Sequence, residues 1–244
     1  MTKFVAIVAG KGGVGKTTIA LNLGTALANF GKDVIVVDAN LSNPNISLHL
    51  GSPKLPATLH DSLDGKINVR DAAYLHPCGV RIIPSSISFE RTRNASYKNL
   101  HNVLLDLVGT TDVVIMDTPP GVGKDVEAVM RIADELIVVT TPEEPSVADA
   151  IKTIRLAEEI GTNVIGVISN RVSNDSFEMS LNSMEALFDK PIIGVIPEDK
   201  KVGRAISMKH PVVYTHPDSP ASINFKKIAA RLMGQEYKES LSKK

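Results

Sequence analysis

Hydrophobic residues along this chain gather in short continuous runs, and segments with a different, helical spacing lie between them. A continuous apolar run bounded by turn residues is typical of a strand that is buried on both faces of a parallel sheet. The runs predict strands at 4–9, 34–37, 80–83, 112–117, 136–140, 164–169 and 192–196.

Apolar positions three or four residues apart indicate helices between these strands. The clearest helix is 17–30, where Leu23, Leu27 and Phe30 share one face and Gly31 follows as a C-cap. Further helices are predicted at 97–108, 146–160, 176–188 and 200–208, with short ones at 58–63 and 68–73 and a last one, marked by the stripe 225–232, that ends at Gly234.

This alternation of strands and helices predicts an α/β protein with a doubly wound, mostly parallel sheet and helices on both faces. It continues nearly from end to end, without a repeat, a linker or a low-complexity tract. We therefore expect a single domain over residues 1–234, followed by a charged C-terminal tail at 235–244.

The first strand leads directly into a glycine-rich segment that reads G-x-x-x-x-G-K-T from Gly10 to Thr17. A strand before this pattern and a helix after it are the context of a P-loop, in which inward-facing N–H groups and the helix N-terminus hold phosphates. In such a loop Lys16 reaches the β- and γ-phosphates and the Thr17 hydroxyl holds Mg²⁺. The pattern predicts nucleotide binding by Gly10, Lys11, Gly12, Gly13, Val14, Gly15, Lys16, Thr17 and Thr18.

Two other predicted strands end in an acid. The run at 112–117 closes with Asp117, in the manner of a Walker B motif, and this carboxylate is expected to hold Mg²⁺. The strand at 34–37 is followed by Asp38 and a polar, turn-rich segment. Ligands of open α/β sheets bind outside the carboxyl ends of the strands, so both acids are expected near the phosphates.

A second lysine makes the P-loop more specific, since Lys11 follows Gly10 and the loop reads K-G-G-V-G-K-T-T. It resembles the deviant P-loop of the MinD/ParA/nitrogenase-iron-protein family of ATPases. The resemblance covers nearly the whole chain and is strongest to archaeal MinD homologues. It implies a P-loop NTPase fold, ATP and Mg²⁺ as ligands, and an ATP-dependent homodimer in which Lys11 reaches across to the partner's nucleotide.

The same resemblance identifies two switch segments. Asp38 matches the first acid of switch I, which implies a role in holding the metal, and Gly121 matches the switch II glycine whose N–H swings to the γ-phosphate. Asn40 stands where the family has the aspartate credited with orienting the attacking water. An amide binds water but is a poor proton acceptor, so we expect slow hydrolysis with Lys11, Lys16 and Asn40 as the catalytic residues.

A third set of residues is implied for the adenine base. MinD-like proteins have an Asn-Arg pair after a strand, matched here by Asn170 and Arg171, and the asparagine amide reads the adenine edge. Such an amide suits adenine, which offers a donor beside an acceptor. Pro197 and Glu198 resemble the loop that lies beside the base in the family.

The composition limits which kinds of binding partner and which cell compartment we expect. The formal net charge is zero, from 27 basic and 27 acidic side chains, so nucleic acid is not an expected partner. The single cysteine, Cys78, excludes an intramolecular disulfide and favours a cytoplasmic location. No signal peptide is expected, because the first apolar run passes straight into the P-loop.

The C-terminal tail bears on membrane attachment. It contains only Tyr237 and Leu241 as large apolar residues, which are too few for firm membrane binding by one chain. A dimer, however, doubles a weak attachment.

These observations predict a MinD-like ATPase that dimerises around Mg-ATP and acts on a regulatory protein partner as a spatial switch, in division-site placement or cargo positioning. A ParA-like DNA-partitioning ATPase and a dethiobiotin-synthetase-like ligase are alternatives on the same fold. DNA binding with ATP distinguishes the first, and stimulation by a small carboxylic acid the second. An iron–sulfur carrier is disfavoured because the bridging cysteines are missing.

Overall fold

An eight-stranded sheet forms the centre of the computed structural model, which describes residues 1–52, 55–173 and 175–237. The strand order is β3-β4-β2-β5-β1-β6-β7-β8, and every neighbouring pair is parallel except β3 with β4. The predicted fold class is therefore confirmed. The strands are β1 (Lys3–Val8), β2 (Val34–Asp38), β3 (Tyr74–Leu75), β4 (Arg81–Ile83), β5 (Val113–Asp117), β6 (Glu135–Thr140), β7 (Asn163–Val172) and β8 (Ile192–Pro197).

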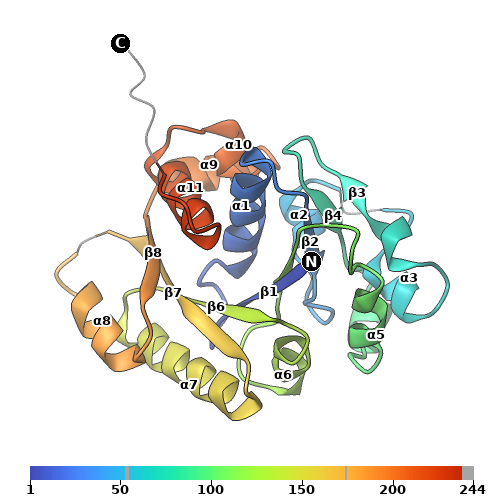
Figure 1. Cartoon of the computed structure of the whole chain (residues 1–244), viewed down its shortest axis with the longest axis horizontal. Helices are drawn as coiled ribbons and strands as arrows, with labels where there is room; N and C mark the ends of the chain where they lie inside the picture. Colours follow the sequence, from blue (N-terminus) through green and yellow to red (C-terminus); the bar gives the residue numbers. More distant parts are fainter. Residues whose placement is uncertain (53–54, 174, 238–244) are drawn as a thin grey trace.

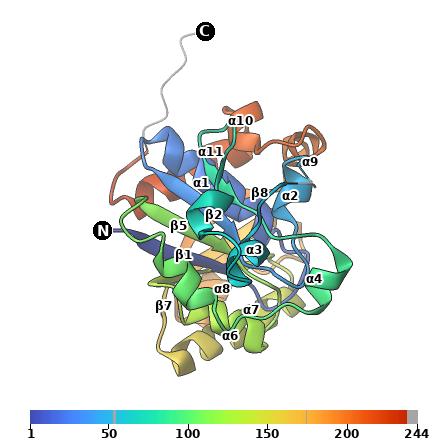
Figure 2. The same cartoon turned by 90° about the vertical axis from the view of Figure 1, so that its right-hand side faces the viewer.

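Helices cover both faces of this sheet (Figures 1 and 2). In both views α1, α10 and α11 lie on one side of the sheet and α6 and α7 on the other. No helix among the described residues is long and apolar enough to cross a membrane. The helices are α1 (Lys16–Asn29), α2 (Ile46–His49), α3 (Leu59–Leu63), the 3₁₀ helix η1 (Val69–Ala72), α4 (Phe89–Arg93), α5 (Leu100–Leu105), α6 (Lys124–Met130), α7 (Glu144–Ile160), α8 (Leu181–Phe188), α9 (Lys200–Ser207), α10 (Val212–Thr215) and α11 (Pro220–Leu232).

The continuous apolar runs contribute side chains to two hydrophobic cores, one on each face of the sheet, because successive side chains of a strand point to opposite faces. In β1, Phe4, Ala6 and Val8 belong to the core under α6 and α7. Val5 and Ile7 belong to the other core, under α1 and α11. A strand buried on both faces needs no polar alternation, which is why these runs read as continuous in the sequence.

The residues predicted to bind the phosphates and the metal are brought together by the parallel register at the centre of the sheet. Ile7 pairs with Asp117 between β1 and β5, and Asp38 pairs with Asp117 between β2 and β5. The P-loop leaves β1 at this same edge. Strands β5 and β6 flank β1 on its two sides, so the loop lies at the point where the strand order reverses, the usual ligand position in such sheets.

Several predicted boundaries are wrong. The helix expected at 97–108 forms only as α5, because the chain at its start turns with an i+3 bond from Leu100 N–H to Tyr97 O. The helix expected at 176–188 begins at Leu181 as α8, where the Ser180 side chain caps it. Strand β7 continues to Val172, so the Asn-Arg pair lies inside a strand rather than after one.

Short elements escaped the sequence pattern altogether. Helices α2, α4, α6 and α10 and the two-residue strand β3 were not expected. Each spans too few residues for a helical or alternating period to emerge. The predicted tail 235–244 is described only as far as Tyr237, whose ring meets Phe30 edge-on at 6.2 Å between centroids. Residues 238–244 lie outside the described residues.

The close packing of α11 against β8 can be tested by adding a side chain at Gly194. A Cβ at Gly194 would lie 2.3 Å from Cδ1 of Ile228, so we expect Gly194→Ala to destabilise the nucleotide-free protein by about 1–3 kcal/mol through overpacking. Gly203 in α9 has open space around it, so Gly203→Ala is the control and should stabilise by up to about 1 kcal/mol through helix propensity. Urea unfolding measures both, and equal stabilities would contradict the packing argument.

Candidate nucleotide-binding site

The P-loop folds into a cradle whose shape depends on glycine at two positions. Gly15 has a φ of 99°, and a Cβ there would lie 2.4 Å from Nδ2 of Asn170. A Cβ at Gly10 would lie 2.3 Å from the carbonyl oxygen of Asp149 in α7. The Asn170 side chain of β7 and the backbone of α7 therefore press on the loop from outside, and glycine is the residue that fits at these two contacts.

Helix α1 begins at the end of this loop with its N-terminus open. Its N-cap, Gly15, offers no side chain, and no acidic residue lies in the first turn. The first bond of the helix runs from Ile19 N–H to Gly15 O, so the N–H groups of residues 16–18 precede the ladder. Unbonded N–H groups at a positive dipole end suit a phosphate.

Lys16 and Thr17 lie at the edge of a buried charge cluster. Lys16 is 8% exposed, and burial lowers the pKa of its ammonium while the Asp117 charge opposes that shift. The Thr17 hydroxyl donates a 2.6 Å hydrogen bond to Oδ2 of Asp117. The residues predicted for the phosphate and the metal thus meet across a sequence separation of 100 residues.

The two strand-end acids are buried side by side. Burial raises the pKa of Asp117 to about 6, against the Thr17 hydrogen bond and the Lys16 charge. Burial, and then the neighbouring Asp117 charge, raise the pKa of Asp38 well above its usual range. Two carboxylates in one dry site without a cation are unfavourable, because each disfavours ionisation of the other.

The oxygens of these acids are used differently. Asp38 accepts N–H bonds from the switch I segment (residues 38–45) and its continuation: Asn40 at 3.3 Å, Asn45 at 3.0 Å and Ile46 at 3.0 Å. Oδ1 of Asp117 is buried and has no partner. A hydroxyl beside an orphaned carboxylate oxygen fits Mg²⁺, which binds one or two protein oxygens together with phosphate and water. Asp38 lies next to this position, with its own oxygens engaged by the loop.

The predicted switch residues are held by the backbone around them. Oδ1 of the buried Asn40 accepts the N–H of Asn43 at 3.2 Å. The Gly121 N–H, which the resemblance assigns to the γ-phosphate, donates to Ala9 O at 2.9 Å, and the residue has a φ of 97°. Lys11 is exposed and makes no hydrogen bond or ion pair with any residue that the structure describes.

All four residues predicted for the adenine line one cavity of about 140 Å³ beside Thr18. Asn170 is buried and its Nδ2 donates to Val14 O at 2.7 Å, so part of its amide already braces the P-loop. Arg171 adopts a left-handed backbone with a φ of 57°. The cavity also has an apolar wall, formed by Ile196, Val202, Ile206 and Phe225. The sequence analysis did not predict this wall, although the spacing of Val202 and Ile206, four residues apart in α9, could have indicated it.

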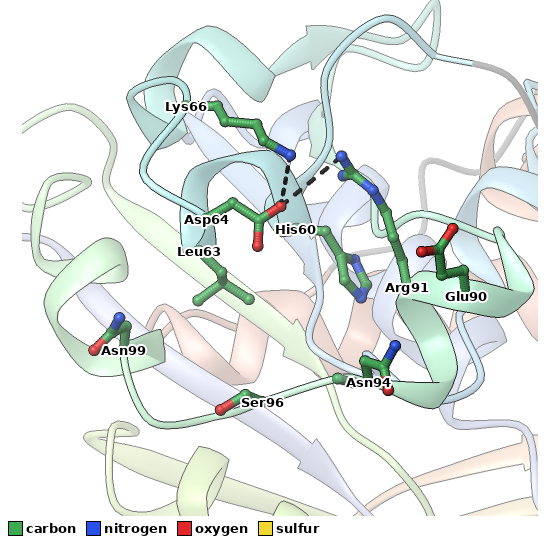
Figure 3. Close-up of a pocket in the computed structure, with 10 residues that line it drawn as sticks. His60, Leu63, Asp64, Lys66, Glu90, Arg91, Asn94, Ser96 and Asn99 are labelled. Atoms are coloured by element: carbon green, nitrogen blue, oxygen red, sulfur yellow. Dashed lines mark hydrogen bonds and ion pairs between the residues drawn. The ribbon is translucent and has the colours of Figure 1, made fainter.

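A larger cavity lies elsewhere, between α3, α4 and the segment that leads into α5 (Figure 3). It has a volume of about 440 Å³ and is lined by both signs of charge. Lys66 and Arg91 converge on Asp64, at 2.9 and 3.9 Å. No residue predicted for the nucleotide lines it. The candidate nucleotide site is therefore placed by the phosphate cradle rather than by the size of a cavity.

Comparison with known proteins shows the family to which such a fold and loop belong. The family model ParA, described as NUBPL iron-transfer P-loop NTPase, matches residues 1–233. An uncharacterised ATP-binding protein of Methanocaldococcus jannaschii is 44% identical over 240 residues, covering 98% of this chain and 91% of the relative. The septum site-determining protein MinD of Pyrococcus horikoshii OT3, solved with Mg-ADP, is 33% identical with a TM-score of 0.90, covering 95% of this chain and 96% of that one.

A second solved structure shows a related protein with a partner. The MinC:MinD cell division protein complex of Aquifex aeolicus matches with a TM-score of 0.85 and 28% identity, over 98% of each chain. Among the residues that the structure describes, no three or more His, Cys, Asp or Glu side chains are grouped so that they could hold a metal ion.

The Thr17–Asp117 pair generates a test that uses metal removal. Thr17→Val deletes the hydroxyl while keeping the side-chain shape, so we expect ADP affinity in Mg²⁺ to fall at least about 10-fold. In EDTA the variant and the wild type should bind ADP equally, because only the metal-dependent part is lost. Fluorescent ADP titration with and without Mg²⁺ measures this. An equal loss in EDTA would mean that Thr17 supports the loop rather than the metal.

Proposed function

The chain belongs to the MinD/ParA family of P-loop ATPases, and we propose that it is an ATP-driven dimer switch that recruits or regulates a partner protein. The observation that carries this proposal is Lys11. It stands exposed at the start of the loop, and it has no hydrogen-bond or ion-pair partner within the described part of its own chain. A lysine in this place suits a negative charge supplied from outside, such as the nucleotide of a second copy.

Each part of the proposed site has a separate task. The N-terminus of α1 and Lys16 bind the phosphates, and Thr17 and Asp117 hold Mg²⁺, whose charge offsets that of the phosphate oxygens. Lys11 of the opposite subunit stabilises charge that develops during phosphoryl transfer, as an arginine finger does. The cavity beside Thr18 takes the adenine, with Asn170 as its polar contact.

Slow hydrolysis is part of the proposal. The Asn40 amide carries no negative charge, and its Oδ1 already accepts the Asn43 N–H. It can orient a water but cannot take the water's proton, so the attacking group is poorly activated. A slow ATPase suits a switch, since the lifetime of the ATP-bound dimer sets how long a partner stays engaged.

The partner is proposed to be a regulatory protein, by analogy with the MinC bound to MinD in the Aquifex complex. The proposal takes residues 1–234 as one domain and the cytoplasm as its location. Liposome co-sedimentation and a salt-dependent DNA shift with ATP test membrane contact and the ParA-like alternative. The ligase alternative requires stimulation of turnover by a small carboxylic acid.

An iron–sulfur carrier is the least supported alternative. The chain has one cysteine, Cys78, which is buried. Its Sγ lies 2.9 Å from Nδ1 of His76, and burial raises the pKa of its thiol. A buried thiol with a raised pKa is a poor cluster ligand, because metals bind the thiolate.

The dimer proposal is tested by measuring the size of the protein in solution by size-exclusion chromatography. We expect the protein to elute as a dimer with ATP and Mg²⁺ and as a monomer with ADP, because only the γ-phosphate gives Lys11 a target across the interface. Lys11→Ala should bind ATP but lose ATPase activity by at least about 100-fold. Lys32→Ala removes another exposed lysine at the opposite end of α1 and serves as the control. Identical elution in both nucleotides would count against the switch.

The role of Asn40 is tested by restoring a carboxylate. Asn40→Asp supplies a proton acceptor in the same shape, so we expect kcat for ATP hydrolysis to rise at least about 10-fold. Asn43→Asp adds the same charge three residues further on, at an exposed position, and should leave kcat within about 2-fold. Single-turnover hydrolysis with excess protein measures all three. A wild type as fast as Asn40→Asp would show that another group orients the water.

A further inference from the structure

One polar contact to switch I comes from outside the nucleotide site. Tyr97 lies between α4 and α5, and its hydroxyl accepts the N–H of Leu41 at 3.1 Å. The two residues are 56 positions apart in the sequence. The phosphate and metal sites described above make no use of this tyrosine, so the bond needs its own explanation.

The bond holds the peptide group that directly follows Asn40. On the other side, the N–H of Asn40 itself bonds to Oδ1 of Asp38 at 3.3 Å. Asn40 is therefore fastened through both of its peptide groups, one to the acid in β2 and one to Tyr97. Because φ and ψ of a residue are set by its two peptide planes, these bonds together define its backbone orientation.

The residues on both sides of this contact are packed into or against the core. The Leu41 side chain is fully buried in the core under α6 and α7, and the Tyr97 ring packs against the same core. The Tyr97 carbonyl also accepts the Leu100 N–H that starts α5. Burial raises the pKa of Tyr97 to about 12, with smaller influences from Ser42 and from Asp125 in the first turn of α6, so its hydroxyl stays protonated at neutral pH.

We propose that Tyr97 is a positioning residue for ATP hydrolysis, whose hydroxyl fixes the orientation of Asn40 from outside switch I. This inference rests on the proposed ATPase function. The phosphates are bound from β1 and α1, which Tyr97 does not contact through any hydrogen bond that the structure describes. Tyr97 therefore acts on turnover through Asn40 and not on the binding of ATP.

The test is Tyr97→Phe, which keeps the ring and its packing but removes the acceptor of the Leu41 N–H. We expect kcat to fall about 5- to 30-fold, because a buried N–H loses its partner and the segment loosens. The KM for ATP should stay within about 2-fold of the wild-type value. If the substitution only destabilised the fold, kcat per folded molecule and the KM for ATP would both stay at their wild-type values.

Tyr74→Phe is a matched control. The Tyr74 hydroxyl also bonds to a loop backbone, accepting the Ala57 N–H at 2.8 Å and donating to its carbonyl at 3.2 Å, but this loop lies outside switch I. Its kcat should equal that of the wild type. Hydrogen exchange gives a second readout: Tyr97→Phe should raise deuterium uptake at residues 39–43, and Tyr74→Phe should raise it only near Ala57.

A double mutant separates action through Asn40 from a general effect. In an Asn40→Ala background, Tyr97→Phe should reduce kcat by less than about 2-fold, since the residue that it positions is gone. The same 5- to 30-fold loss in that background would overturn the proposal, as would wild-type kcat and uptake in Tyr97→Phe alone. A wild type that neither dimerises nor hydrolyses ATP would instead overturn the proposed function, and hydrogen exchange would still show whether Tyr97 holds the segment.

Discussion

Two carboxylates buried side by side, Asp38 and Asp117, are the constraint on which the rest of this structure depends. They lie at the carboxyl ends of adjacent parallel strands, where the register places them opposite each other. Removing one carboxylate from water is costly, and placing a second beside it adds repulsion. The chain meets this cost with three N–H bonds to Asp38, and with the Thr17 hydroxyl and the nearby Lys16 charge at Asp117.

This arrangement places the switch I backbone against one of the two acids. The N–H groups of Asn40, Asn45 and Ile46 close around Asp38, which lies beside the position proposed for the metal. Tyr97 and the buried Leu41 connect the same segment to the core under α6 and α7. Switch II approaches from the other side, where the Gly121 N–H bonds to Ala9 O. Switch I is thus held by bonds to Asp38 and Tyr97, and the switch II glycine by a bond to the residue before the P-loop. Hydrogen bonds of this kind can be exchanged, which suits the proposed nucleotide-dependent change of state.

Asn170 links the phosphate and base ends of the site. Its Nδ2 supports the Val14 carbonyl in the P-loop, and its side chain also lines the cavity proposed for adenine. A nucleotide base that engaged this amide would meet a group already fixed by a buried bond, so little side-chain freedom would be lost on binding. The close approach of Gly15 to the same Nδ2 explains why the loop has no room for a side chain there.

The sequence by itself determined the fold class and the phosphate loop, because both follow from patterns within short stretches of the chain. Continuous apolar runs, helical spacing and the Gly10–Thr17 pattern need no distant partner to be recognised. Asn170, Arg171, Pro197 and Glu198 were proposed for the base only by resemblance, and the structure places all four along one cavity. Only the tertiary structure decided that Asp117 keeps one oxygen free, that Asp38 is occupied by its own loop, and that Tyr97 reaches Leu41. These facts depend on contacts between residues far apart in the chain, and such contacts follow from packing, which no local pattern encodes.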